Sequence, residues 1–360
     1  MPKTPFFTIK RSALHDGLRA FREAIPGVEV YFAVKANPEP VVLSTLAAAG
    51  ACFEVASVYE MNVLDGLGIT TAHMAYGTAV KPSAHIRDAH SAGIRVMSAD
   101  SIAEVDKIAD LAPNASVFIR VRVDDSRSTF AFGEKFGAEV ADAYALASYV
   151  RSRGLQCRGL SFHVGSQSVR PSAWAAAIDL VRPIYDKFEA EGHPLPWLNI
   201  GGGFPCQYEG PAVPTIEEIG AEITRALDEL RPVRLLAEPG RFLAAPAATL
   251  TASVVGRSER GGSHWLFLDA GCYNGLFEAM SYQGRTQYPV ASLDPASSNQ
   301  TLLFNVAGPT GDSADVIARD VRLPANIQEG GRLLFSKVGA YTMSLSVPFN
   351  GFPRPELVVE

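Results

Sequence analysis

The chain has 360 residues, of which 47% are hydrophobic and 19% are charged, and its formal net charge is −6 at pH 7. This composition predicts a soluble globular protein with two domains, or with one large barrel and an appendage. The acidic balance and the lack of long Lys or Arg runs argue against a surface for nucleic acid or anionic membrane.

The chain start and the cysteines indicate the expected compartment. Residues 1–7 lack the apolar core of a signal peptide. The best candidate for a membrane span, residues 242–255, is too short and is broken by Pro246. The cysteines are scattered and form no C-x-x-C pair, and they are Cys52, Cys157, Cys206 and Cys272. We therefore expect a cytoplasmic protein with reduced thiols, without a disulfide framework or a zinc site.

One unit recurs between Glu29 and Glu238: a short β-rich run, a polar turn, and an amphipathic segment rich in Ala and Leu. The predicted strands are residues 30–35, 52–56, 73–77, 94–98, 117–123, 157–164, 197–201 and 233–238. The predicted helices between them are residues 40–49, 60–67, 83–92, 102–111, 139–153, 173–191 and 216–230. Capping-box patterns that begin at Ser57, Ser101 and Thr215 support three of these helix starts.

Alternating strands and helices predict a parallel sheet, and eight strands with helices between them predict a closed (β/α)8 TIM-type barrel. A doubly wound open sheet is the alternative, but it normally carries a G-x-G-x-x-G turn after its first strand. Here that turn reads Lys35-Ala36-Asn37-Pro38 and contains no glycine. We therefore expect an α/β barrel over residues 12–241.

The pattern changes after Arg241, where β runs appear without matching helices. These runs cover residues 249–255, 264–268, 300–306, 332–337 and 356–359, with Gly-Gly turns at 261–262 and 330–331. We expect a C-terminal β-rich domain over residues 242–360. The apolar stretch at 6–9 is too early to be a barrel strand, so residues 1–11 are expected to join this second domain.

Lys35 closes the apolar run of the first predicted strand. Burial of an ammonium group removes its hydration and lowers its pKa, which makes the amine a nucleophile for a carbonyl. The alternative is a lysine that snorkels from a strand end. Functional residues of such barrels sit at the C-terminal ends of the strands. Those ends carry, in order, Lys35, Glu54 with Ser57, Tyr76, Asp100, Arg120, His163 with Ser166, Gly201-Gly202-Gly203, and Glu238.

Three of these features complement the lysine. The glycine turn after the seventh strand suits a phosphate, although it could be a tight turn without a ligand. His163 could be structural, as a lone His often is; it has no second ligand at metal spacing, so a metal role is not expected, and its flat imidazole could instead stack on an aromatic cofactor ring. Glu238 could pair with Arg241, or it could face a pyridine nitrogen and keep it protonated. An amine, a phosphate turn and an acid on one barrel face together indicate pyridoxal phosphate (PLP) as cofactor.

Short ordered motifs along nearly the whole chain carry a family resemblance. They are Ala33-Val34-Lys35-Ala36-Asn37, Phe162-His163-Val164-Gly165-Ser166, Gly201-Gly202-Gly203-Phe204-Pro205, Glu238-Pro239-Gly240-Arg241, Gly308-Pro309-Thr310, Gly339-Ala340-Tyr341-Thr342 and Phe349-Asn350-Gly351-Phe352. The chain resembles the fold-type III PLP-dependent decarboxylases: ornithine, lysine and diaminopimelate decarboxylases, which share the alanine-racemase architecture.

The resemblance implies Lys35 as the Schiff-base lysine, His163 stacked on the cofactor ring and Glu238 on the pyridinium nitrogen. It implies further cofactor-binding residues, most of them at the phosphate: Arg120 near the ring, Ser166, Gly202, Gly203, Gly240, Arg241 and Tyr341. It also implies a head-to-tail homodimer with shared active sites. In that dimer the partner would supply the loop 308–315, and Lys135 would pair with Asp315 across the interface.

Two departures from the family pattern bear on the substrate. The loop after Gly-Pro-Thr usually carries Cys-Asp, and that cysteine returns a proton to the substrate carbon; here the loop reads Gly311-Asp312. Diamine-forming members place an Asp near residues 277–283 to bind the distal ammonium, where this chain offers Ser281 or Gln283. An unpaired buried charge costs several kcal/mol. We therefore expect these residues to bind a substrate with a neutral, amide-like or acidic distal end, rather than plain ornithine or lysine.

The expected activity is α-decarboxylation of an amino acid, which yields an amine and carbon dioxide. Three alternatives remain: an ornithine or lysine decarboxylase with altered contacts, an amino-acid racemase, and an inactive decarboxylase-like regulatory binding protein. Glu238 argues against a racemase, because alanine racemases place an Arg against the pyridine nitrogen. The retention of Lys35, His163 and the glycine turn argues against an inactive protein.

Overall fold

The structure is a computed structural model that describes residues 2–230, 234–280, 287–294 and 300–360. The chain divides into two compact units. The barrel unit comprises residues 15–205 and 213–240, and the β unit comprises residues 1–14, 206–212 and 241–360. We expected one contiguous barrel over residues 12–241, whereas residues 206–212 within this range belong to the β unit. Each unit is described by itself.

The barrel unit contains a closed barrel of parallel strands, in the order β10-β11-β2-β3-β4-β5-β6-β8. These strands are β2 (Val28–Ala33), β3 (Cys52–Val55), β4 (Met74–Tyr76), β5 (Val96–Ala99), β6 (Ser116–Arg120), β8 (Gln156–Ser161), β10 (Trp197–Asn199) and β11 (Arg234–Ala237). Each coincides with one of the predicted strands, so the (β/α)8 barrel is confirmed. Residue 233, the first of the last predicted strand, lies outside the described residues.

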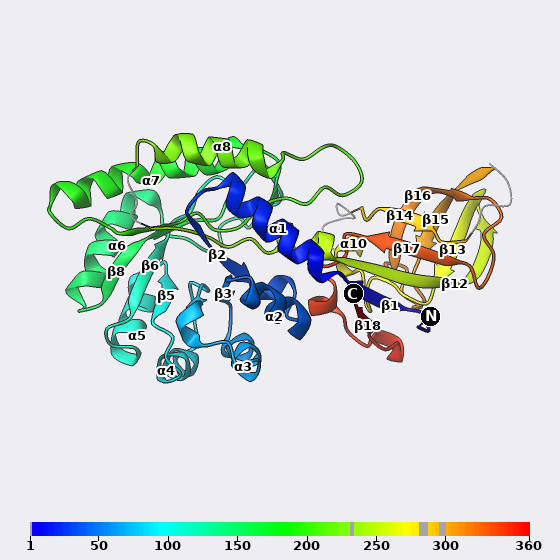
Figure 1. Ribbon diagram of the computed structural model, residues 1–360, viewed down its shortest axis with the longest axis horizontal. Coiled ribbons are helices and arrows are strands. Elements are labelled where there is room, and N and C mark those ends of the chain that lie inside the picture. The colour runs from blue at the N-terminus through cyan, green and yellow to red at the C-terminus, as the bar shows by residue number, and fades with distance from the viewer. Residues whose placement is uncertain (1, 231–233, 281–286, 295–299) are drawn as a thin grey trace. The chain divides into compact units, whose positions relative to one another are not determined.

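Helices alternate with the barrel strands (Figure 1). They are α1 (Arg11–Ala24), α2 (Pro40–Ala48), α3 (Val58–Gly66), α4 (Ser83–Ser91), α5 (Ile102–Leu111), α6 (Val140–Ser152), α7 (Ser172–Ala190) and α8 (Ile216–Leu227). None of the helices in the described ranges is long and apolar enough to cross a membrane. The complete capping box is that of Thr215 and Glu218 at the start of α8.

The barrel strands are nearly continuous apolar runs because they are buried on both faces. In β6 the first four residues are buried and only Arg120 is partly exposed. Tyr31, Ala75, Phe118 and Leu236 come from four different strands and pack into one buried cluster. Such side chains fill the interior of a barrel of this size, which leaves the strand ends as the place for polar groups.

The β unit is built on a mixed sheet with the path β14-β17-β12-β13-β15-β16. The strands are β12 (Ala248–Arg260), β13 (Ser263–Leu268), β14 (Val290–Ser292), β15 (Thr301–Ala307), β16 (Val316–Pro324), β17 (Arg332–Ser336) and β18 (Glu356–Val359). The N-terminal strand β1 (Phe6–Ile9) pairs antiparallel with β12 and parallel with β18. Short helices α9 (Arg241–Ala244) and α10 (Phe277–Met280) belong to this unit.

Several elements were not predicted. Strands β14 and β16 have no counterpart among the expected runs. In the barrel unit, β7 (Ser128–Phe130) and β9 (Ser166–Ser168) form a two-stranded antiparallel ribbon after β6 and β8. All four cysteines are free.

Candidate active site

The ends of the barrel strands bring the predicted polar residues to one edge, because parallel strands of a closed barrel end on the same side. Lys35 lies in a 3-10 turn (Val34–Ala36) directly after β2, and Glu54 is the third residue of β3. Arg120 ends β6 and Glu238 follows β11. His163 follows β8 by two residues.

Lys35 forms an ion pair with Glu54, through its Nζ and the Glu54 Oε2. The Glu54 side chain is 4% exposed, whereas that of Lys35 is 46% exposed. Of the two interpretations of Lys35, a buried amine and a side chain that extends from a strand end, the exposed fraction favours the second: β2 ends at Ala33, and Lys35 lies in the turn that follows. The amine is accessible to a small molecule, and a buried carboxylate orients it.

The His163 imidazole is neutral. Burial lowers its pKa well below the usual value, and the charges of Arg120 and Lys35 lower it further. Its Nδ1 accepts the Gly165 backbone N–H at 3.1 Å, so the ring proton resides on Nε2. The Phe132 ring meets the imidazole edge-on, with centroids 4.7 Å apart. Among the described residues, no group of three or more His, Cys, Asp or Glu side chains could hold a metal ion.

Glu238 is a carboxylic acid with a raised pKa of about 6, first because of burial and then because of the nearby Glu54 charge. Asn199 donates its Nδ2–H to Glu238 Oε1 at 2.6 Å. The Oδ1 of the same Asn199 accepts the Gly201 N–H at 2.9 Å. Asn199 thus joins the acid to the glycine turn. The sequence reasoning missed it, although a polar residue that ends an apolar strand was the available signal.

The glycine turn leaves no room for side chains. Gly201 and Gly203 have φ values of 65° and 101°, which favour glycine. A Cβ on Gly202 would lie 2.8 Å from the Glu238 carbonyl oxygen and 2.9 Å from His163 Nε2. Only glycine therefore fits at this turn, because atoms of His163 and the Glu238 backbone occupy the space that a side chain would need.

In the β unit, Arg241 is buried and binds Glu278 through two hydrogen bonds of 2.6 and 2.7 Å. Its Nη1 also lies 3.0 Å from the Tyr208 hydroxyl. Its guanidinium group lies 4.8 Å from the centre of the Tyr341 ring. Glu278 and Tyr208 were not identified from the sequence, because each is distant from Arg241 along the chain.

The other predicted residues are placed as follows. Arg120 lies over the Phe136 ring at 5.3 Å, and Lys135 lies over the same ring at 5.0 Å. Ser166 begins strand β9, and Gly240 is the last residue of the barrel unit. Ser281 and Gln283 lie outside the described residues.

The loop at 308–315 is organised by a buried carboxylate. Asp315 is 2% exposed and accepts the N–H of Cys272 at 2.7 Å and the hydroxyl of Thr310 at 2.7 Å. Asp312 accepts the Ala314 N–H at 2.9 Å and a hydrogen bond from the Tyr273 hydroxyl. These contacts raise the pKa of Tyr273 to about 12, chiefly through the hydrogen bond to Asp312. A Cβ on Gly311 would have no atom within 4 Å.

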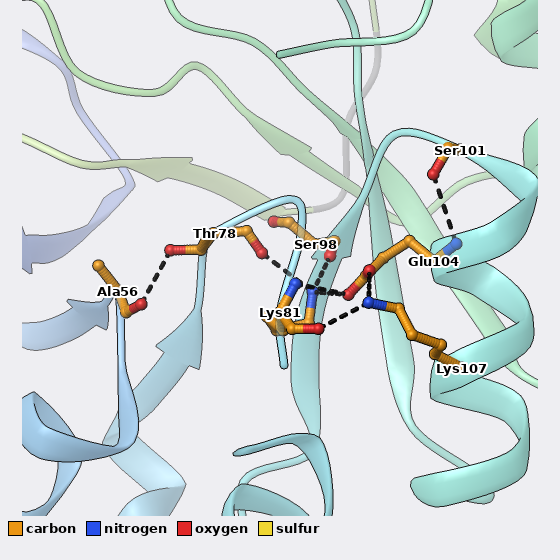
Figure 2. A network of polar contacts seen from close by, with 7 residues as sticks. All are labelled: Ala56, Thr78, Lys81, Ser98, Ser101, Glu104 and Lys107. Carbon is orange, nitrogen blue, oxygen red and sulfur yellow. Dashed lines mark hydrogen bonds and ion pairs between the residues drawn. The ribbon is translucent and has the colours of Figure 1, made fainter. Parts of the chain in front are cut away.

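A second lysine follows the barrel strand β4, and it is sealed. The Lys81 side chain has no exposed surface, and its Nζ contacts Glu104 Oε1 at 2.9 Å. The same Nζ donates to the Thr78 and Ser98 carbonyl oxygens at 2.9 and 2.6 Å. Lys107 reaches the other Glu104 oxygen at 2.6 Å (Figure 2). The capping-box pattern at Ser101 is therefore only half realised, since the Glu104 side chain is turned to these lysines.

Tyr76 and Asp100, the remaining strand-end candidates, serve this part of the barrel. The Tyr76 ring is buried, with Lys81 Nζ 5.5 Å from its centre. Asp100 accepts the Gly137 N–H at 2.9 Å, so its carboxylate holds a loop.

Comparison with known proteins places this arrangement in a family. The model described as "Pyridoxal-dependent decarboxylase, pyridoxal binding domain" matches residues 11–245. The lysine/ornithine decarboxylase of Selenomonas ruminantium is 33% identical over 350 residues, which cover 97% of this chain and 88% of that protein.

Solved structures agree over the whole chain. Lysine/ornithine decarboxylase from Vibrio vulnificus, complexed with cadaverine, has a TM-score of 0.90 at 33% identity, and the match covers 99% of this chain and 94% of that one. The arginine decarboxylase of Paramecium bursaria Chlorella virus, bound to agmatine, has a TM-score of 0.92 at 27% identity, and the match covers 100% and 96%.

Proposed function

This chain belongs to the pyridoxal-dependent decarboxylases, and on that premise we propose that it decarboxylates an amino acid whose distal group is not a plain ammonium ion. The enzyme class, a PLP-dependent carboxy-lyase acting on amino acids, follows from the family. The residue roles and the substrate class that follow are the proposal.

The residues at the strand ends fit the cofactor. Bound PLP supplies an electron sink for the electron pair that the departing carboxylate leaves behind. Lys35 Nζ would carry it, because this amine is accessible and oriented by Glu54. The backbone N–H groups of Gly202 and Gly203 would approach its phosphate, because glycine has no side chain to keep a phosphate away from the backbone.

His163 and Glu238 would hold the ring. A neutral imidazole can lie flat against an aromatic ring without adding charge, and the pKa shift of His163 keeps it neutral at physiological pH. Glu238 would face the ring nitrogen. Because its pKa is already raised to about 6 by burial, it would gain most from a cationic partner. The contribution of Arg241 and Tyr341 to phosphate binding remains a prediction.

One observation carries the substrate proposal. Glu278 is the only acid in the described part of the segment in which diamine-forming relatives are expected to bind a distal ammonium. Its carboxylate is buried and engaged on both oxygens by Arg241. A carboxylate saturated in this way has no charge to offer a second cation, and an unpaired ammonium would be costly to bury. A neutral, amide-like or acidic distal end avoids that cost.

A competition assay tests this proposal. The enzyme is incubated with an equimolar panel of amino acids that contains ornithine, lysine, arginine, their amide and acidic analogues, and both enantiomers, and amines are quantified by mass spectrometry. We expect the largest kcat/KM for a member without a distal ammonium. Faster turnover of ornithine or lysine than of every other member would refute it.

A second candidate is an ornithine or lysine decarboxylase with altered contacts. The names of the Selenomonas and Vibrio relatives favour it. So does Asp312, which keeps a carboxylate in the loop at 308–315. The same panel decides between the two candidates.

We also propose that Gly311 removes a proton donor that thiol-bearing relatives use at the substrate carbon. Lys35 Nζ or water would then deliver this proton, with less control over where it is placed. Gly311→Cys is sterically feasible, because a Cβ there meets no atom within 4 Å. We expect this variant to lose activity during turnover several-fold more slowly than wild type. Equal inactivation rates would contradict the idea.

The homodimer expected from the resemblance is likewise a proposal. Lys135 is exposed, as a residue that pairs with a partner subunit must be, while Asp315 is held inside its own loop. Sedimentation of wild type and Lys135→Glu would test the pair. A wild-type monomer at micromolar concentration would exclude the dimer.

A further inference from the structure

Gly77, the first residue after β4, stands where a side chain would collide with Glu54. A Cβ built on Gly77 would lie 2.7 Å from Glu54 Cγ and 2.9 Å from its Cδ, and still closer to Oε1. Distances under 3.0 Å essentially never occur for real Cβ atoms. Gly77 does not have the left-handed backbone that would by itself require glycine. The absence of a side chain at Gly77 is therefore required by the position of the Glu54 side chain and not by the backbone conformation.

The two residues are fixed relative to each other by the sheet. In the parallel pairing of β3 and β4, Glu54 lies opposite Ala75 and Val55 lies opposite Tyr76. The Gly77 N–H then donates to the Val55 carbonyl oxygen at 3.1 Å. This hydrogen bond continues the ladder by one residue and places the Gly77 Cα against the Glu54 side chain.

The loop of residues 77–81 is held by hydrogen bonds and an ion pair at both ends. The Thr78 hydroxyl donates to the Ala56 carbonyl oxygen at 3.0 Å, which ties the loop to the end of β3. At its other end Lys81 is anchored twice by Glu104: its Nζ lies 2.9 Å from Oε1 and its backbone N–H donates to the same oxygen at 3.1 Å (Figure 2). Lys107 also donates to the Lys81 carbonyl oxygen at 2.6 Å. Buried contacts of this kind fix the loop of residues 77–81, which begins beside the Glu54 side chain.

We propose that Gly77 is a positioning residue, and that its missing Cβ, on a loop held by the Lys81–Glu104 pair, lets the Glu54 carboxylate reach Lys35 Nζ. An alanine at 77 would push the carboxylate away, and the amine would lose the charge that favours its ammonium form. The consequence for loading and releasing an amino acid rests on the proposed function. The coupling of Gly77, Glu54 and Lys35 does not.

The test measures the reactivity of Lys35 in the full-length protein after removal of PLP, in the absence of substrate. Trace labelling with acetic anhydride near pH 8 is read out on the Lys35 peptide by mass spectrometry. We expect Gly77→Ala to raise the labelling rate about tenfold, because more of the amine is deprotonated when the carboxylate is displaced. Glu54→Gln should raise the rate to a similar extent.

The matched controls separate positioning from general loosening. Gly66→Ala is the steric control, since a Cβ at Gly66 meets no atom within 4 Å, and its labelling rate should equal that of wild type. Glu54→Ala removes Cγ, Cδ and Oε1, the three atoms that a Cβ at residue 77 would meet, so Gly77→Ala should not change the labelling rate on this background. On the Glu54→Gln background, Gly77→Ala should add nothing.

Two outcomes would overturn the proposal: an unchanged labelling rate in Gly77→Ala, or the same increase on the Glu54→Gln background as in wild type. If Gly77→Ala folds too poorly to be labelled, the melting temperature decides, because the alanine should be tolerated on the Glu54→Ala background, which lacks the atoms it would meet, but not beside Glu54. Equal losses of Tm on both backgrounds would then refute the coupling. Since no substrate is used, failure of the proposed decarboxylation leaves this result intact.

Discussion

Two lysine–glutamate pairs follow strands of the same barrel, and they differ in whether the amine can be reached. Lys35 follows β2 and pairs with Glu54 from β3, while Lys81 follows β4 and pairs with Glu104 from α5. The Lys35 side chain is 46% exposed, and that of Lys81 is 0% exposed. The Lys81 Nζ has three oxygen partners, which match the three N–H donors of an ammonium group.

This contrast separates burial from reactivity. Burial lowers the pKa of Lys81 even though Glu104 opposes the shift. Burial by itself therefore does not identify the catalytic lysine, because the buried lysine is Lys81 and not Lys35. The Lys81 amine has all its donors engaged and is inaccessible, so its role is to stabilise the loop. The amine suited to chemistry is Lys35, because one carboxylate orients it and a small molecule can still reach it.

The largest expected effect comes from the accessible pair. Lys35→Ala should lower the decarboxylation rate by about 10⁴-fold or more, because it removes the group that would carry the cofactor. The visible absorbance of bound PLP should disappear with it, while the urea midpoint changes little, since the side chain is half exposed. Retained absorbance at wild-type intensity would break the assignment of Lys35.

The sealed pair should show the reverse. Lys81→Met should lower the free energy of unfolding by about 3–5 kcal/mol, because it leaves the Glu104 charge buried with a poorer partner. Urea unfolding measures this loss, and protein that remains folded should still show PLP absorbance. Lys107→Met is the control: its side chain is 32% exposed and should cost about 1 kcal/mol or less. A loss of PLP binding in folded Lys81→Met would contradict a purely structural role.

Glu238 lies close enough to the accessible pair for both charges to affect its pKa. Glu238→Gln should lower kcat by about 10²-fold with a small effect on KM, because a neutral amide would hold the ring nitrogen less firmly in its protonated form. Steady-state kinetics measure the split between kcat and KM. Glu217→Gln, the same change at an exposed position of α8, should leave both constants unchanged. An unaltered kcat in Glu238→Gln would remove Glu238 from the mechanism.

The smallest effect concerns stability and pH near the accessible pair. Burial raises the pKa of Glu60 to about 7, although the Ala56 N–H opposes this shift. A raised pKa means that the folded state binds the proton more tightly. The resulting stabilisation is complete below the ordinary value of 4.5 and is lost as the pH rises through about 7.

Glu60→Gln removes this charge and keeps an acceptor for Ala56. It should therefore stabilise the protein by about 2 kcal/mol at pH 8 and have little effect at pH 5. Urea unfolding at the two pH values measures the difference, with Glu217→Gln as the control. A gain of the same size at both pH values would show that the charge of Glu60 is not the cause.

Much of the fold could be predicted, because it is encoded locally. The barrel strands are short apolar runs separated by turn residues, and each was located within a few residues. The β7–β9 ribbon and strand β16 could not be found in this way: β7 and β9 are short segments of mainly Ser, Thr and Gln without an apolar run, and β16 has a mixed burial pattern that no simple alternation describes.

The candidate site was predicted only in part. Chain order and strand ends were enough to bring Lys35, His163, the glycine turn and Glu238 to one edge. They were not enough to identify Asn199, which joins Glu238 to that turn, or Glu278, which occupies Arg241. The position of a strand end predicts where a side chain lies. Its hydrogen bonds depend on which side chains from other parts of the chain lie next to it in the fold.

The sequence by itself determined the barrel, the order of its motifs and the family they resemble, because strand periodicity and turn chemistry act over a few neighbouring residues. Only the tertiary structure decided which lysine is sealed and which is accessible. Glu104 looks like a helix cap in the sequence, yet its carboxylate lies against Lys81, 23 residues earlier, and not against its own helix start. Gly77 likewise carries no signal of its own. Its role depends on Glu54 lying beside it, and that neighbour is set by the pairing of two strands.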